Sequence, residues 1–309
     1  VDPQAHELAV DGDRMAYGKL LLATGAWPRQ LEVPGSDLDG IFTLRTVGNS
    51  KAIRDAAAGA ERAVVVGAGF IGMEVAASLR QIGKEVSLDH LGRWLFDQLG
   101  VEQLSDELAA LYESKGVELV LGNEVEAFRG NGSLEQVTTK NGRAVEADIA
   151  VVGVGVQPVT DVLEGSGIEV DNGIVVNQRF ETNVPDVYAA GDVANFFDPL
   201  FDKQRRIEHW SNANYQGTEV GKVLAGAEGG YDTVSTFFTE VFGKTIKVFG
   251  DAKRDSQVVV HGALLDDDLY ALYGDEGEET IGALSVGQTE EVEDLLKQQV
   301  RTHAPLRDR

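Results

Sequence analysis

The chain has 309 residues, of which 43% are hydrophobic, so it is long enough for two or three domains with apolar cores and is not a disordered chain. Lys and Arg number 27 against 51 Asp and Glu, which gives a formal charge of −24, and there is no cysteine. The charge argues against nucleic acid or an anionic membrane as a partner. The lack of cysteine excludes disulfides, thiolate metal sites and redox-active thiols from this sequence.

The acidic residues are spread along the chain rather than gathered in one tail, which favours a halophilic source, where salt screens their mutual repulsion. No apolar run reaches the length of a membrane span, and the first residues lack the pattern of a signal peptide. We therefore expect a cytoplasmic protein. The five histidines show no metal-ligand spacing, so no metal site is predicted.

The N-terminal part has patterns typical of short strands and one helix. The predicted elements are two strands around a turn at Asp11–Asp13, an apolar strand that runs into Thr24-Gly25, a connector over Leu31–Gly40 and a helix over Ser50–Ala58. A dense β-α-β pattern follows them.

The stretch from Arg62 to His90 combines an apolar strand, three glycines in GxGxxG spacing, a helix and a second strand. The strand is predicted over Ala63–Val66, the helix over Ile71–Ile82 and the second strand over Glu85–Leu88. A GxGxxG alone is a weak signal, but between a strand and a helix it predicts a dinucleotide-binding unit. A glycine-rich turn without a ligand is the alternative interpretation.

Each glycine of this motif has a physical task. Gly67 permits the tight turn out of the strand, Gly69 lets a pyrophosphate approach the backbone because it has no Cβ, and Gly72 lets the helix pack closely on the sheet. The helix N-terminus would offer N–H groups and the positive end of the helix dipole to the phosphates.

The remainder of the chain predicts two further regions. Before Ala225, the pattern favours a helix, a strand, Asn-Gly turns and a second helix. These are at Gln103–Lys115, Val117–Leu121, Asn131-Gly132, Asn141-Gly142, Asn172-Gly173 (within a hairpin over Ile168–Val176) and Ala213–Leu224. After Ala225, five β-runs and a helix over Thr289–Val300 predict a small antiparallel sheet covered by one helix. The β-runs are Phe237–Val241, Thr245–Phe249, Gln257–His261, Leu269–Tyr273 and Thr280–Val286.

Three further motifs each follow a predicted strand: ATG at Ala23–Gly25, GVGVQP at Gly153–Pro158 and VYAAGD at Val187–Asp192. In this order around the GxGxxG unit, they resemble the FAD-dependent pyridine nucleotide oxidoreductases, in particular the ferredoxin reductase-like and apoptosis-inducing-factor-like branch. The resemblance covers essentially the whole chain. It implies an α/β fold, in which a doubly wound Rossmann-type NAD(P) domain is inserted in a FAD domain and a C-terminal α+β domain follows.

The family's first strand–GxGxxG–helix unit, which binds the ADP half of FAD, has no counterpart in this sequence. The resemblance therefore implies only a partial FAD domain, with an incomplete FAD site in this chain. The expected division is 1–48 and 157–227 for the partial FAD-binding domain, 49–156 for the NAD(P)-binding domain and 228–309 for the C-terminal interface domain.

The resemblance also implies roles for single residues. Glu74 would lie near the nicotinamide, Asp192 would hydrogen-bond the ribityl chain of the flavin, and Trp210 would face the flavin and nicotinamide rings. Phe238 occupies a place where many relatives carry tryptophan beside the flavin. The expected cofactor-binding residues are Thr24, Gly25, Gly67, Gly69, Phe70, Ile71, Gly72, Glu74, Asp89, His90, Arg93, Gly153, Gly155, Gly191, Asp192, Trp210 and Phe238.

Three of these residues have simpler alternative roles. Asp192 could be only a turn residue at a strand end, Trp210 could be ordinary interdomain packing, and Glu74 could be only a partner for the helix dipole.

The choice between NAD and NADP is left open by the sequence. An acid at the end of the second strand would bind the ribose 2′-hydroxyl and favour NAD. His90 holds that position in the family's register, and Asp89 precedes it by one residue. His90 with Arg93 could instead accept a 2′-phosphate. Because neighbouring strand residues point to opposite faces, Asp89 and His90 cannot both serve.

The function implied by the resemblance is hydride transfer from NAD(P)H to FAD, followed by electron transfer to a ferredoxin-type carrier. No side chain is then required as an acid or base, because the cofactors carry the redox chemistry. An NAD(P)H oxidase that reduces oxygen and a non-enzymatic NAD(P)H sensor are the alternatives. Because ferredoxins are usually acidic too, high salt or a local basic patch near Lys203, Arg205 and Arg206 could relieve the repulsion between the carrier and this acidic protein. The C-terminal sheet could pair in a homodimer or cover the flavin.

Overall fold

The computed structural model describes residues 1–306. The chain divides into two compact units, each made of two segments. Unit 1 comprises Val1–Trp27 and Val156–Phe237, and unit 2 comprises Pro28–Gly155 and Phe238–Arg309. The four-segment division expected from the sequence has other bounds than these units, and it stays a prediction.

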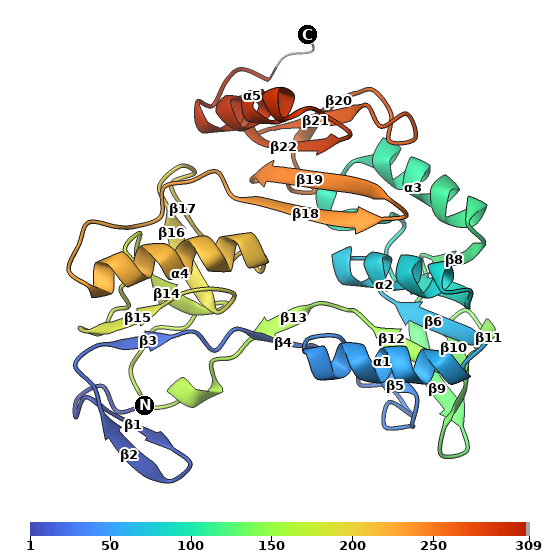
Figure 1. The fold of residues 1–309 in the computed structure, drawn as a ribbon, viewed down its shortest axis with the longest axis horizontal. Coiled ribbons are helices and arrows are strands. Elements are labelled where there is room, and N and C mark those ends of the chain that lie inside the picture. The colour runs from blue at the N-terminus through green and yellow to red at the C-terminus, as the bar shows by residue number, and fades with distance from the viewer. Residues whose placement is uncertain (307–309) are drawn as a thin grey trace. The chain divides into compact units, whose positions relative to one another are not determined.

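A five-stranded parallel sheet forms the centre of the first segment of unit 2 (Figure 1). In spatial order its strands are β5 (Ile41–Phe42), β12 (Ile149–Val152), β6 (Arg62–Val66), β7 (Glu85–His90) and β8 (Val117–Leu121). Its helices are α1 (Val47–Gly59), α2 (Phe70–Gln81) and α3 (Glu102–Ser114), with a short 3-10 turn η1 (Asp97–Leu99) between the last two. The predicted strand, glycine loop, helix and strand are confirmed in this order.

The residues of this sheet explain why it is covered on both faces. Strand β6 is an unbroken apolar run with four buried residues, as parallel strands between two layers usually are. Helix α2 packs on β6 and β7. A three-stranded antiparallel sheet packs against Val64 and Val66 through side chains such as Phe128 and Val137. Its strands are β9 (Val125–Gly130), β10 (Leu134–Thr139) and β11 (Ala144–Glu146).

Strand β7 places its last two residues on opposite faces of the parallel sheet. Asp89 pairs in register with Val66, whose side chain belongs to the core beneath the three-stranded sheet. Asp89 is 1% exposed, and its Oδ1 accepts a hydrogen bond of 3.1 Å from Ser87 Oγ. Its Oδ2 has no partner among residues 1–306. Burial raises the pKa of Asp89 to about 6, against the opposing effect of the Ser87 hydrogen bond.

The second segment of unit 2 is the predicted antiparallel sheet with one helix, and the structure confirms it (Figure 1). In spatial order the strands are β18 (Thr236–Val241), β19 (Lys244–Gly250), β22 (Thr280–Val286), β21 (Leu269–Gly274) and β20 (Gln257–His261). Helix α5 (Glu290–Arg301) packs on β19 and β22. Within unit 2, the Glu107 carboxylate of α3 accepts the Leu264 N–H, and Arg254 pairs with Asp97 at 2.7 Å.

Unit 1 is built from short strands around one apolar core and the helix α4 (Trp210–Leu224). Its elements before α4 are β1 (Glu7–Val10), β2 (Asp13–Ala16), β3 (Leu20–Leu22), β4 (Ala26–Pro28), β13 (Val156–Pro158), η2 (Asp161–Leu163), β14 (Ile174–Val176), β15 (Val187–Ala189), β16 (Ala194–Asp198) and β17 (Lys203–Arg205). The predicted first hairpin is confirmed as the antiparallel pair β1–β2. Strands β3 and β15 pair in parallel, which places both their carboxyl ends at one edge.

The predicted hairpin over Ile168–Val176 is confirmed as a short one. Asn172 and Gly173 form its turn with positive φ, an antiparallel bridge joins Val170 and Ile174, and the Val175 N–H donates to the Glu169 carbonyl at 3.0 Å. Strand β14 also pairs in parallel with β16, which the sequence analysis did not predict, and β16 pairs antiparallel with β17. The local turn signal was therefore sufficient for the hairpin but not for the distant partner of the same strand.

The buried carboxyl of Asp89 makes a pH-dependent contribution to stability. Because folding raises its pKa above the unfolded value, this contribution is present at low pH and is lost as the pH rises through about 6. Replacing Asp89 with Asn removes the dependence. Between about pH 5 and about pH 8, we expect the wild type to lose about 1–1.5 kcal/mol of unfolding free energy more than Asp89→Asn does.

Urea unfolding at the two pH values measures this difference. Glu85→Gln is the matched control, since Glu85 is an exposed acid at the start of the same strand. Parallel pH profiles for the wild type and Asp89→Asn would contradict the prediction.

Candidate functional site

The loop after β6 depends on three glycines whose backbones approach one another. Gly67 has φ +107°, and a Cβ on it would collide with the Gly153 carbonyl. A Cβ on Gly72 would collide with the Gly67 carbonyl. The Gly67 N–H donates to the Asp89 carbonyl at 2.7 Å, and the Gly153 N–H donates to the Val66 carbonyl at 2.8 Å. The structure therefore brings Gly67, Gly72 and Gly153 together, and the packing requires that Gly67 and Gly72 have no side chain.

Gly69 differs from these glycines, because nothing in the fold fills the space beside it. It is the N-cap of α2 with an ordinary φ of −80°, and a Cβ there would meet only Gln98 Nε2, at 3.9 Å. As a glycine, this N-cap has no side chain that could cap the helix. Open space beside a helix N-terminus suits a pyrophosphate, so the loop fits the phosphates of a dinucleotide.

Phe70 and Ile71 form the first turn of α2 beside this loop. The Phe70 ring packs against Phe96, with 5.1 Å between ring centroids. The Phe96 N–H donates to the Ala68 carbonyl at 3.1 Å, which braces the loop from the side of η1. Ile71 is 42% exposed.

His90, and not Asp89, lies beside the glycine loop. Its Nδ1 accepts a hydrogen bond from the Ala68 N–H at 3.3 Å, so the neutral ring carries its proton on Nε2. Burial lowers the pKa of His90, against the opposing effect of Asp97. Arg93 is exposed and makes no hydrogen bond or ion pair within the described chain. Since Asp89 is buried on the other face, only His90 and Arg93 of these three lie on the loop side or at the surface.

Glu74 lies one turn into α2 and is anchored through one carboxylate oxygen. Its Oε1 accepts hydrogen bonds from Thr239 Oγ1 at 2.6 Å and from the Glu240 N–H at 3.3 Å, both in β18 of the same unit. The expected place of Glu74 near a nicotinamide stays a prediction. Thr239 was missed by the sequence analysis.

In unit 1, a second group of expected residues lies at the common carboxyl edge of β3 and β15. Thr24 and Gly25 follow β3, and Gly191 and Asp192 follow β15. The Thr24 hydroxyl donates to the Val159 carbonyl at 2.7 Å, and Gly25 has φ +71°. The carboxyl edge of neighbouring parallel strands is where α/β folds bind ligands, so the expected strand-end loops do meet.

Gln216 of α4 accepts a hydrogen bond from the backbone of the Gly191 loop, and the sequence analysis did not predict this residue. It is fully buried, and its Oε1 accepts the Gly191 N–H at 2.8 Å. Its Nε2 is buried and has no partner in the described part of the chain. An unpaired buried donor under a strand-end loop fits a site for a polar ligand such as the flavin. A polar residue at i+4 from buried Asn212 and i−4 from buried Val220 was the signal that could have revealed it.

The remaining expected residues are placed within their own units. Gly155 has φ +94°, and its carbonyl accepts the Arg29 N–H at 2.9 Å. Trp210, the first residue of α4, is 81% exposed, and Phe238 in β18 is 66% exposed. Rings that stand this far out of their own units are free to contact a cofactor.

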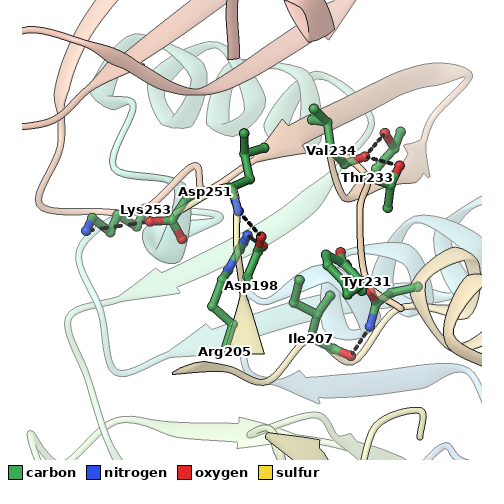
Figure 2. Close-up of polar contacts among 11 residues, drawn as sticks. Asp198, Arg205, Ile207, Tyr231, Thr233, Val234, Asp251 and Lys253 are labelled. Atoms are coloured by element: carbon green, nitrogen blue, oxygen red, sulfur yellow. Dashed lines mark hydrogen bonds and ion pairs between the residues drawn. The ribbon is translucent and has the colours of Figure 1, made fainter. Parts of the chain in front are cut away.

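Two of the three residues of the suggested basic patch, Arg205 and Arg206, are buried. The Arg205 side chain is 10% exposed and pairs at 2.8 Å with Asp198, which is fully buried (Figure 2). The Arg206 side chain is 9% exposed, pairs with Glu208 and donates to the Asp192 carbonyl at 3.2 Å. Both guanidiniums are buried in ion pairs within unit 1, so they do not form an open surface for an acidic carrier.

No helix within residues 1–306 combines the length and the apolar composition that crossing a membrane would require. No cluster of three or more His, Asp or Glu side chains in that range could hold a metal ion.

Comparison with known proteins shows what this geometry belongs to. Apoptosis-inducing factor 3 from Homo sapiens is 36% identical over 89% of this chain and 46% of its own length. The ferredoxin–NAD(+) reductase subunit of the benzene 1,2-dioxygenase system from Pseudomonas putida is 34% identical over 82% of this chain and 62% of its own. The crystal structure of a ferredoxin reductase from Rhodopseudomonas palustris aligns with a TM-score of 0.89 at 29% identity, over 96% of this chain and 73% of that one.

The chain therefore spans 46% and 62% of the length of these two curated relatives. The profile of one family matches residues 1–217, more than two thirds of the chain. The glycine loop and the paired strand-end loops both lie in this range. The chain thus belongs to the pyridine nucleotide-disulphide oxidoreductase family.

Proposed function

We propose that this chain is the NAD(P)H-binding part of a FAD-dependent oxidoreductase that takes hydride from NAD(P)H and passes electrons to a ferredoxin-type carrier. The observation that carries the proposal is the open space at Gly69, the N-cap of α2. Family membership and two relatives named as ferredoxin–NAD(+) reductases support it.

The residues of the chain would bind, orient and shield the cofactors. The N–H groups at Phe70 and Ile71 would bind the pyrophosphate, while Gly67 and Gly72 keep the loop close to the sheet. Asp192 and the loop over Gln216 would hold the polar part of the flavin. When bound, FAD would supply the chemistry that accepts a hydride and releases single electrons.

Spectroscopy and kinetics test this proposal. The purified protein is scanned for bound flavin, and NADH or NADPH is then added without oxygen. We expect bleaching of the flavin absorbance, and its return when oxidised ferredoxin is supplied. Rapid return with oxygen alone would instead favour the NAD(P)H oxidase. Tight NAD(P)H binding without any bleaching of bound flavin would favour the sensor, and no NAD(P)H binding at all would refute the proposal.

Gly69 and Gly72 allow binding to be separated from folding. In Gly69→Ala the fold has room for the methyl group, so we expect an unchanged melting temperature and NAD(P)H affinity about tenfold lower or more, because the methyl group occupies the place of the pyrophosphate. In Gly72→Ala the methyl group meets the Gly67 carbonyl, so we expect a loss of about 1–3 kcal/mol of stability.

Calorimetric titration with NADH and NADPH, together with thermal melts, measures both effects. Equal affinity of Gly69→Ala and the wild type, in folded protein, would show that the phosphates bind elsewhere.

We further propose that the adenosine ribose of the coenzyme meets His90 and Arg93, not Asp89. The contact of His90 with the Ala68 N–H and the burial of Asp89 on the other face support this assignment. No carboxylate of β7 then faces the 2′ position, so NADPH is not repelled. Because the Pseudomonas putida relative is named for NAD(+), the measured preference is informative.

A carboxylate introduced at position 90 tests the assignment. We expect His90→Glu to shift the ratio of NADH to NADPH affinity toward NADH by about tenfold or more, through 2′-hydroxyl binding and phosphate repulsion. Asp89→Asn is the matched control on the same strand and is expected to leave the ratio unchanged. A larger shift in Asp89→Asn than in His90→Glu would reverse the assignment.

A further inference from the structure

The anchoring of Glu74 by β18 has a consequence beyond the proposed function. Glu74 belongs to the Rossmann segment, whereas Thr239 and Glu240 belong to the C-terminal antiparallel sheet. Both of the anchoring hydrogen bonds, at 2.6 Å from Thr239 Oγ1 and 3.3 Å from the Glu240 N–H, end on the same oxygen, Oε1. Glu74 Oε2 makes no hydrogen bond to any of residues 1–306.

The burial of Thr239 directs its hydroxyl toward Glu74. Thr239 is 1% exposed, whereas its neighbours Phe238 and Glu240 are exposed, as expected for alternating residues of a strand. The hydroxyl of Thr239 is thus turned inward to α2. A buried hydroxyl that donates to a carboxylate makes a charge-assisted hydrogen bond, which is stronger than a bond between neutral groups.

The helix turn that carries Glu74 is held from a third element. The Tyr112 hydroxyl of α3 donates to the carbonyl of Met73 at 2.8 Å, and the Tyr112 ring packs edge-on against Phe242 with 4.8 Å between centroids. Both the backbone before Glu74 and its Oε1 are therefore fixed, while Oε2 is left for another partner.

We propose that Thr239 is a positioning residue, which orients the Glu74 carboxylate so that Oε2 meets the nicotinamide of bound NAD(P)H. The inference rests on the proposed function, since it requires that NAD(P)H binds at the loop before α2. It assigns the C-terminal sheet a part in coenzyme binding, through one hydroxyl. Without that hydroxyl the carboxylate turns about its side-chain bonds, and a misplaced group loses most of its effect on a reacting ring.

The test compares Thr239→Val, which has the same shape without the hydroxyl, with Thr239→Ser, which keeps it. We expect Thr239→Val to lower kcat/KM for flavin reduction by NAD(P)H by about tenfold and to weaken NAD(P)H binding to flavin-free protein by a similar factor. Thr239→Ser is expected to restore most of both. The melting temperature of each variant reports on folding separately.

A double-mutant cycle distinguishes positioning from a general structural role. If Thr239 acts through Glu74, Thr239→Val has no further effect on NAD(P)H affinity in a Glu74→Ala background. The same loss in both backgrounds, or no loss in Thr239→Val when the wild type binds NAD(P)H, overturns the inference and leaves the proposed function standing. A wild type that binds neither NADH nor NADPH overturns the proposed function itself.

Discussion

The fold depends on a close approach of backbones that only glycine allows. At the carboxyl end of β6, the main chains of Gly67, Gly72 and Gly153 lie so near one another that a methyl group on Gly67 or on Gly72 would force them apart. This approach seats α2 directly over the sheet, so that the N–H groups of its first turn are held in one place. Gly69 lies in the same loop but outside that contact. The three packed glycines set the position of the loop, and the fourth leaves the opening.

The last two residues of β7 point to opposite faces of the sheet, one into the core and the other toward the glycine loop. Asp89 extends to the face under the three-stranded sheet, where it pairs with Ser87 and is nearly inaccessible. His90 extends to the other face, where its ring receives an N–H from the glycine loop. Asp89 and His90 are adjacent in the strand, so one residue of register separates an acid that belongs to the core from an imidazole that contacts the glycine loop. A similar division recurs in β18, where Thr239 is turned inward and Phe238 outward.

Much of the fold could be predicted from the sequence, because its signals are local. The GxGxxG between a strand and a helix, and the β-runs and amphipathic helix after Ala225, need only short windows, and the structure confirms both. The resemblance to the family is likewise shown. What could not be predicted depends on long-range contacts: the parallel pairing of β14 with β16 has no local signal, whereas the short hairpin at Asn172-Gly173 does. The suggested basic patch loses Arg205 and Arg206 because Asp198 and Glu208 bury them in ion pairs, which no spacing reveals.

The order in which paired strands are synthesised affects how the chain can fold during translation. Strand β3 ends at Leu22, but its partner β15 begins only at Val187, so the ribosome must add most of the intervening chain before they can pair. The parallel sheet of unit 2 closes much earlier, once β12 is complete at Val152. Strand β3 therefore stays without this partner while a whole Rossmann sheet can form after it. An apolar strand that is left unpaired in this way is open to aggregation until β15 has been made.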